Sequence, residues 1–150
     1  MRLNRERLEA KFRDIRKAEE RLSKFLKIRK EDFLSNEDFI HIARSHLLIA
    51  AEASIGICFH IAAKKLKQAI REYTSCFELL EKNNLLTGEL SRFMGKLIGL
   101  RNRIVHRYDE VDYGLIYDNL RDIINNLDKL IAEVSRLLLN EEKESDEKTH

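Results

Sequence analysis

The stretch IYDNLRDIINNLDKLIAEVSRLL, residues 116–138, has the most regular apolar pattern in the chain. Its apolar residues recur at alternating steps of four and three, at positions 116, 120, 123, 127, 130, 134 and 137. Steps of this kind place side chains on one face of an α-helix. Ile124, Ile131 and Leu138 widen that face beyond the narrow seam of a coiled coil. The stretch therefore predicts a helix that packs in a bundle.

The rest of the chain follows the same helical pattern. Of its 150 residues, 43% are hydrophobic and 36% charged; there is no proline, and five glycines are too few for the turns of an all-β fold. The sequence predicts an all-α fold, an antiparallel bundle of about five helices in one domain over residues 1–140. Residues 141–150 hold five acids and two lysines and are expected to form a charged, disordered tail. The expected helices span approximately residues 4–30, 36–67, 70–82, 88–108 and 113–138.

Short polar residues mark where three of these helices begin. Ser35, with Asp38 three residues later, predicts the start of the second helix. Thr87 predicts the start of the fourth helix, and Asp109 or Asp112 the start of the last. Each of these side chains can accept a hydrogen bond from a free N–H group of the first helical turn.

The sequence predicts a cytoplasmic protein that does not enter a membrane. The first seventeen residues are too charged for a signal peptide. The longest weakly polar run, 47–63, is short for a membrane span and contains Glu52 and His60, so it predicts a buried central helix. Cys58 and Cys76 lack the spacing of a metal site and are expected to be buried thiols in a reducing compartment.

The net charge of +2 conceals a basic N-terminal region. Residues 1–30 hold twelve lysines and arginines against five acids. A basic helix of this kind is one way of meeting RNA. The interpretation that the sequence favours is a solvated helix face with ion pairs between residues four apart.

The segment RNRIVHRYDEVD, residues 101–112, gathers polar chemistry at the end of the predicted fourth helix. Arginine presents a rigid fork of N–H donors that fits phosphate oxygens. Histidine titrates near neutral pH and serves as a general base or acid. On a regular helix Asn102 and His106 are about 40° apart and Arg101 and Tyr108 about 20°, whereas Arg101 and His106 are about 140° apart. Bringing the last two together requires an unwound final turn, long side chains, or a second copy of the helix across a two-fold axis.

These residue types suit cleavage of RNA without a metal ion. RNA carries its own nucleophile, the 2′-hydroxyl, and a histidine can take its proton while an arginine stabilises the phosphate. The departing 5′-oxygen needs a proton in return, which a second histidine in a dimer would supply. The expected products are a 2′,3′-cyclic phosphate and a 5′-hydroxyl. No carboxylate cluster with metal-ligand geometry is apparent, so neither a metal nor another cofactor is expected.

The order of these residues resembles that of HEPN-domain toxins. Arg101, His106 and Tyr108 form their R-x4-H-x-Y pattern, Asn102 follows the arginine, and the pair VD follows two residues after the tyrosine. The likeness is to the HepT group, whose members pair with a MntA-type minimal nucleotidyltransferase antitoxin. It extends over about residues 1–138 of the chain.

The resemblance implies an all-helical homodimer and a metal-independent endoribonuclease toxin of a type VII-like toxin–antitoxin pair. It makes Arg101 and His106 the expected catalytic pair, with Asn102 in support. It also makes Tyr108 the expected acceptor of AMP from the antitoxin, which would add phosphate charge where the RNA phosphate binds. The alternative is a non-catalytic binding subunit of a nucleotidyltransferase pair, and the intact Arg101–His106 pair favours the enzyme.

Other polar residues leave alternatives open. Glu52 lies within an otherwise apolar helix, so it either supports the site by orienting Arg101 or Asn102, or is simply half-exposed. Tyr113 and Tyr117 follow the motif closely. They are expected to pack within the fold, although their position near the motif leaves stacking on RNA bases open.

Overall fold

The structure, a computed structural model, describes residues 2–70 and 72–149 of the chain. These residues form seven α-helices and two 3₁₀-helices, and no strand occurs among them, which confirms the all-α prediction. The predicted number of about five helices was too low because two short helices, α2 and α6, form in the connections. The elements are α1 (Arg5–Ser23), η1 (Lys24–Lys27), α2 (Lys30–Leu34), α3 (Glu37–Lys65), α4 (Tyr73–Lys82), α5 (Gly88–His106), η2 (Tyr108–Glu110), α6 (Tyr113–Asp118) and α7 (Leu120–Thr149).

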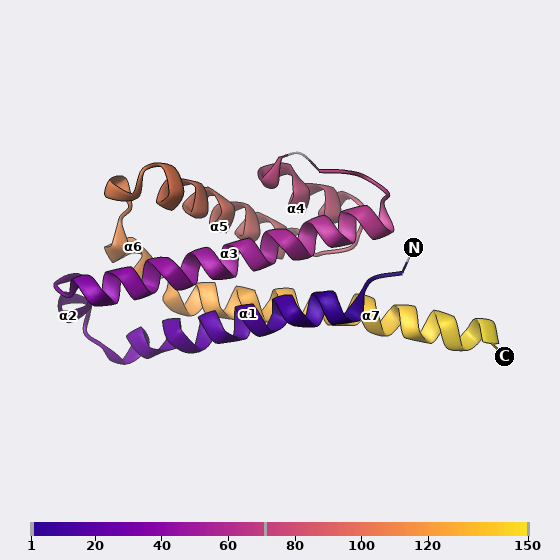
Figure 1. The fold of residues 1–150 in the computed structure, drawn as a ribbon, viewed down its shortest axis with the longest axis horizontal. Helices are drawn as coiled ribbons and strands as arrows, with labels where there is room; N and C mark the ends of the chain where they lie inside the picture. The colour runs from indigo at the N-terminus through magenta and orange to yellow at the C-terminus, as the bar shows by residue number, and fades with distance from the viewer. Residues whose placement is uncertain (1, 71, 150) are drawn as a thin grey trace.

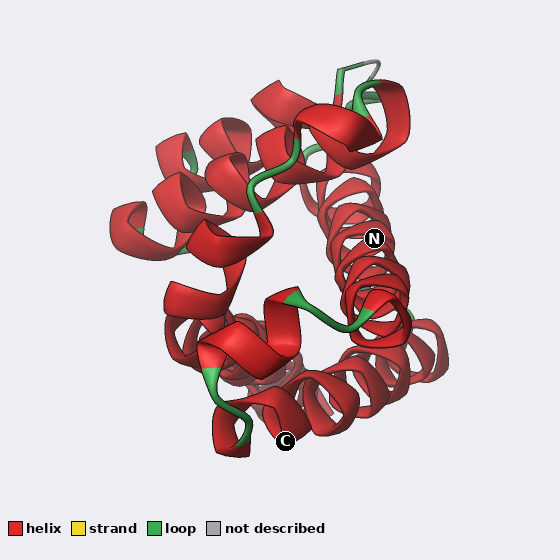
Figure 2. Cartoon of the chain, turned by 90° about the vertical axis from the view of Figure 1, so that its left-hand side faces the viewer, coloured by secondary structure: helices red, strands yellow, loops and turns green. Residues whose placement is uncertain are grey.

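Four long helices, α1, α3, α5 and α7, run alternately up and down and form an antiparallel bundle (Figure 1). Viewed from the end, α3 packs against α1 and α5, and α7 packs against the same two helices (Figure 2). The shorter α4 packs on α5 and α3. Both ends of the chain lie at one end of the bundle, whereas α5 terminates at the other end (Figure 1).

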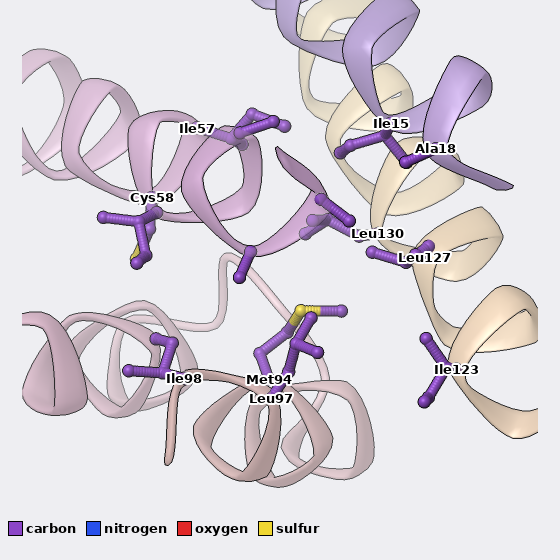
Figure 3. Packing of buried hydrophobic residues seen from close by; sticks show 14 of the residues in the cluster. Ile15, Ala18, Ile57, Cys58, Met94, Leu97, Ile98, Ile123, Leu127 and Leu130 are labelled. Atoms are coloured by element: carbon purple, nitrogen blue, oxygen red, sulfur yellow. The ribbon is translucent and has the colours of Figure 1, made fainter. Parts of the chain in front are cut away.

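Buried side chains from all four long helices meet along the bundle axis (Figure 3). Fully burying a Leu, Ile or Met side chain stabilises a fold by about 1.5–3 kcal/mol, so this contact holds the four helices together. The apolar face predicted from residues 116–138 supplies the α7 side of the core from Leu120 onward. Ile116 belongs to α6, so the prediction of one continuous helix over 113–138 was wrong at Asn119. The side chains labelled in Figure 3 are Ile15 and Ala18 of α1, Ile57 and Cys58 of α3, Met94, Leu97 and Ile98 of α5, and Ile123, Leu127 and Leu130 of α7.

Helix starts follow the predicted chemistry, with one shift. Thr87 caps α5 by accepting from Leu90 N, and Asp112 caps α6 by accepting from Leu115 N at 3.1 Å. At α3 the capping residue is Asn36, which accepts from the backbone N–H groups of residues 38 and 39, so the prediction of Ser35 was wrong by one residue. Asparagine and serine cap helices about equally well, so the two neighbours compete for the position.

The first helix is shorter than predicted. It was expected to reach residue 30, but α1 ends at Ser23 and the chain turns through η1 into α2. The turn brings Phe25 against Phe33, with ring centroids 5.0 Å apart. Tyr117 of α6 packs on Phe33 from the other side and donates a hydrogen bond to the Ile28 carbonyl, so Tyr117 packs within the fold.

Helix α3 is the most enclosed element of the bundle. By length and composition alone it could cross a membrane, but more than half of its most apolar stretch is buried inside the protein. The core helix of a water-soluble bundle has the same composition, so the prediction of a buried central helix agrees with the structure. Cys58 of α3 is bonded to Cys76 of α4 in a disulfide, which corrects the expectation that both are free thiols. The two helices pack closely at this point, and the Cα atoms of Cys58 and Cys76 lie 6.2 Å apart.

The C-terminal segment is helical and tied to the bundle. A disordered tail was predicted from residue 141 because of its charge, whereas α7 continues to Thr149; His150 lies outside the described residues. Glu141 is buried and accepts from Leu3 N at 3.1 Å, and it pairs with Lys65 at the end of α3. Two of the charges that suggested disorder, those of Glu141 and Glu142, thus have partners that lie far away in the sequence.

Candidate active site

The polar residues of segment 101–112 do not lie on one continuous helix. Helix α5 ends at His106, where Arg107 N donates to Arg103 O at 2.7 Å and closes the last turn. Arg107 then leaves the helix with φ −145° and ψ 50°, and Tyr108 opens η2. The prediction that the helix reaches Tyr108, on the same face as Arg101, was therefore wrong. The chain must reverse here so that Asp112 can cap α6.

Arg101 is held in place by contacts on three sides. Its Nε donates to Glu52 Oε1 at 2.6 Å, and its Nη1 donates to Asn102 Oδ1 at 3.1 Å. Its guanidinium also lies over the Tyr73 ring, 5.2 Å from the ring centroid. The side chain is only 17% exposed, so the guanidinium is oriented before any ligand arrives.

Glu52 combines the two interpretations that its sequence position allowed. Its side chain is 49% exposed, and its carboxylate also pairs with Arg101. The contact joins the middle of α3 to the last turns of α5. The pair leaves part of the guanidinium fork unused, because Nη2 has no hydrogen-bond partner among the residues described.

His106 lies at the solvent-exposed end of α5. Among the described residues, neither a hydrogen bond nor an ion pair engages its ring, and none links it to Arg101. The two residues remain about 140° apart around the helix axis. One chain alone therefore presents an anchored arginine and an unengaged histidine on different sides of α5.

Tyr108 is the most exposed of the large hydrophobic or aromatic side chains, at 63%. Its neighbour is Arg44 of α3, whose guanidinium lies 5.7 Å from the Tyr108 ring centroid. Tyr113 flanks the same guanidinium at 5.6 Å, and its hydroxyl accepts from Arg44 Nε at 2.8 Å. Arg44 and Tyr73 were missed in the sequence because nothing in their local context separates them from other surface residues.

A groove of about 420 Å³ adjoins the motif between α5, η2 and α6. Leu100, Arg103, Val111 and Leu115 are among its lining residues. Arg101, His106 and Tyr108 do not line this groove. His106 and Tyr108 instead face open surface in the single chain, and Arg101 lies mostly covered by Glu52, Asn102 and Tyr73.

The remaining histidines of α3 have structural surroundings. His60 Nε2 accepts from Asn4 N at 2.9 Å, and burial, followed by the charges of Lys64 and Arg7, lowers the pKa of its imidazole. Burial also lowers the pKa of His46, with Arg21 and Lys17 adding to the effect. Within the described part of the chain, no three His, Cys, Asp or Glu side chains are placed to hold a metal ion.

The all-helical bundle has the arginine and histidine of an R-x4-H-x-Y motif in the last turns of α5 and its tyrosine at the start of η2, which are features of the HEPN class of protein. Comparison with known proteins places the chain more narrowly. The chain belongs to the HepT-like family, described as "Ribonuclease HepT-like", which it matches over residues 15–134.

Characterised relatives share a substantial part of the chain. A tRNA nuclease HepT of Aphanizomenon flos-aquae is 32% identical over 127 residues, covering 83% of this chain and 85% of the relative. An mRNA nuclease HepT of Shewanella oneidensis is 29% identical over 102 residues, covering 68% and 74%. A solved structure of a tri-AMPylated Shewanella oneidensis HEPN toxin in complex with an MNT antitoxin has the same fold, with a TM-score of 0.81 at 23% identity over 89% of this chain and 99% of that one.

Proposed function

We propose that the protein is the endoribonuclease toxin of a toxin–antitoxin pair and that it cleaves RNA without a metal ion. The observation that carries the proposal is Arg101, oriented by Glu52, Asn102 and Tyr73 and five residues before an exposed His106. Two relatives are named as nucleases of tRNA and of mRNA, which supports RNA as the substrate class.

In this mechanism Arg101 binds the scissile phosphate. The N–H groups that Glu52 and Asn102 leave unused donate to phosphate oxygens and stabilise the negative charge that grows as the 2′-oxygen attacks. His106 takes the proton of the 2′-hydroxyl. The bond from phosphorus to the 5′-oxygen breaks, giving a 2′,3′-cyclic phosphate and, after that oxygen gains a proton, a 5′-hydroxyl.

The mechanism requires a second copy of the chain. Arg101 and His106 of one copy diverge around α5, so the arginine of one chain and the histidine of another converge only across a two-fold axis. Ile42 and Ile49 of α3 and Val105 of α5 are exposed apolar side chains. The Glu52–Arg101 contact and the antiparallel course of the two helices place Val105 at the level of Ile49, beside the site. An apolar rim of this kind supports a homodimer whose interface contains both motifs.

Regulation in this proposal acts through Tyr108. Its exposed hydroxyl accepts AMP from a MntA-type nucleotidyltransferase antitoxin, and the added phosphate blocks the approach of RNA. The related toxin of Shewanella oneidensis was solved in a tri-AMPylated state with its antitoxin, which supports this assignment. The pair would operate in the cytoplasm, where RNA and nucleoside triphosphates are both present.

The decisive test is RNA cleavage in EDTA. His106→Ala and Arg101→Ala should each lose about 10²–10⁴-fold in cleavage rate, because one lacks the general base and the other the phosphate clamp. Circular dichroism should show that both variants keep their helices. Arg136→Ala, which removes an exposed cation from α7, is the matched control and should cleave normally.

The substrate and the products of the reaction show which results would contradict the mechanism. DNA should remain intact, since it lacks the 2′-hydroxyl. A requirement for Mg²⁺, a 5′-phosphate product, or full activity in His106→Ala would refute the mechanism and favour a non-catalytic binding subunit.

A further inference from the structure

Arg44 of α3 lies outside the R-x4-H-x-Y motif but is built into the same surface as Tyr108. Its guanidinium lies near two aromatic rings, 5.7 Å from the Tyr108 centroid and 5.6 Å from that of Tyr113. The Tyr113 hydroxyl accepts from Nε at 2.8 Å, and His41 Nδ1 accepts from Nη1 at 3.1 Å. Four contacts thus fix one cation beside the exposed tyrosine.

The positive charge of Arg44 is not neutralised by a neighbour. Within the described residues no carboxylate lies at ion-pair distance from it, in contrast to Arg101, which pairs with Glu52. Tyr113 and His41 use two of the five N–H donors of the guanidinium, so three remain for another ligand. An oriented, uncompensated guanidinium with free donors is a binding group for phosphate.

We propose that Arg44 binds the phosphate of the nucleotide that is transferred to Tyr108, both during the transfer and in the modified protein. The inference rests on the function proposed above, because it concerns the same modification. In this proposal Arg44 of α3 binds the nucleotide during transfer and holds its phosphate afterwards. Arg44 is a positioning residue for Tyr108 in the free protein and becomes a phosphate ligand when the nucleotide arrives.

The transfer defines where the charge appears. The Tyr108 phenolic oxygen attacks the α-phosphorus of ATP, a bond forms between that oxygen and phosphorus, and the bond from the α-phosphorus to the bridging oxygen of pyrophosphate breaks. Pyrophosphate leaves with the bonding electrons, and the phenolic proton passes to solvent. Tyr108 then carries a phosphodiester with one negative charge. A guanidinium already placed against the Tyr108 ring can pair with that charge after only a side-chain rotation.

The geometry also explains why the contact involves an arginine. The guanidinium lies near the Tyr108 ring and spends its Nε–H on Tyr113 and one Nη1–H on His41. The remaining N–H groups are left for two phosphate oxygens. A lysine at the same position could supply charge but not this set of directed donors.

The experiment follows AMP transfer from radiolabelled ATP by the cognate nucleotidyltransferase, with intact-mass spectrometry locating the product. Arg44→Ala should slow transfer to Tyr108 by about 10–100-fold, the effect expected for the loss of a charge-assisted hydrogen bond. Arg44→Lys should recover part of that loss because the charge remains. Tyr113→Phe keeps Arg44 but removes its anchor, and it should give a smaller reduction than Arg44→Ala.

Arg107→Ala is the matched control. Arg107 precedes Tyr108 directly, is largely exposed and pairs only with Glu110, at 3.8 Å, among the described residues. Its removal lowers the local charge by the same amount and should leave transfer unchanged. If Arg107→Ala and Arg44→Ala slowed AMP transfer equally, the effect would come from the loss of any nearby positive charge, and the inference would be overturned.

RNA cleavage by the unmodified variants tests whether Arg44 acts in RNA binding instead of in AMP transfer. The loss in transfer by Arg44→Ala should exceed any loss in cleavage at least tenfold, whereas equal losses would place Arg44 in the RNA site and overturn the inference. Normal transfer to Arg44→Ala would also overturn it and leave the proposed regulation intact. If wild-type Tyr108 accepted no AMP at all, the proposed regulation itself would fail.

Discussion

Glu19 is a single side chain that makes the stability of the fold depend on pH. Its carboxyl group is buried on α1 and faces Asp128 of α7, and Arg16 bonds to both. Burial, followed by the hydrogen bond and negative charge of Asp128, raises the pKa of Glu19 from 4.5 to about 8. The folded protein therefore holds a proton at neutral pH that the unfolded chain releases.

The consequence is a loss of stability as the pH rises. Because the folded pKa of Glu19 exceeds the unfolded value, its contribution is complete below pH 4.5 and is lost as the pH approaches 8. The melting temperature of the wild type should fall between pH 6.5 and 8, while that of Glu19→Gln should stay level. His46 and His60 have lowered pKa values and act in the opposite direction, mainly below 6.5. Parallel melting curves for wild type and Glu19→Gln would refute this assignment; the exposed Glu20→Gln serves as control.

The site residues that could be read from the sequence share one property: their chemistry is visible locally. Arg101, Asn102, His106 and Tyr108 fall within eight consecutive residues, and Glu52 is a lone charge in an apolar helix. Arg44 of α3 and Tyr73 of α4 could not be predicted in this way. Their contacts depend on how α3 and α4 pack against α5 and η2. The sequence around a surface arginine does not indicate that packing.

At the scale of elements, the interior of each long helix was easier to predict than its ends. The alternating apolar steps of α7 are a property of its own sequence and need no partner to be recognised. The course of α7 beyond residue 140 is supported by Glu141, whose partners are Leu3 and Lys65. The same holds for α5, whose last turn closes at His106 because the following residues must reverse direction. Tertiary contacts decide such boundaries, so a charge-based reading of residues 141–150 as a tail missed the helix.

The Glu141 contacts predict an unequal effect of two neighbouring substitutions. Glu141→Ala leaves the Lys65 ammonium and the Leu3 N–H without their partner, and the free energy of unfolding should fall by about 2–4 kcal/mol. Glu142→Ala removes only an exposed pair with Arg5 and should cost less than about 1 kcal/mol. Urea unfolding followed by circular dichroism measures both. Equal, small losses would mean that the last turns of α7 do not support the bundle.

At the scale of the whole molecule, the proposed function makes the single chain half of a site. The anchored guanidinium and the exposed imidazole lie on different sides of α5, and exposed apolar side chains lie beside the first of them. The bundle does not bury Ile42, Ile49 and Val105, which remain open to solvent in the single chain. The proposed two-fold dimer covers them and completes the active site in one step.

A charge placed in this rim should separate the two copies. Ile49→Asp would bring two carboxylates together at an apolar interface, so the dimer dissociation constant should rise about 100-fold or more. Light scattering at micromolar concentration should then show a monomer, and RNA cleavage should fall with it. Leu139→Asp changes an equally exposed apolar side chain on α7 and should remain dimeric. A wild-type monomer, or dissociation by Leu139→Asp alone, would contradict the proposed interface.

The joining of Leu3 to Glu141 also has a practical consequence for handling the protein. It holds the N-terminal segment against residue 141 of α7, and the last turns of α7 extend further, so both ends of the chain lie at the end of the bundle opposite to the end of α5 (Figure 1). An affinity tag, a fluorescent label or a surface tether added at either terminus therefore extends away from the residues proposed to bind RNA. An immobilised molecule would present the end of the bundle that holds the proposed site to the solution.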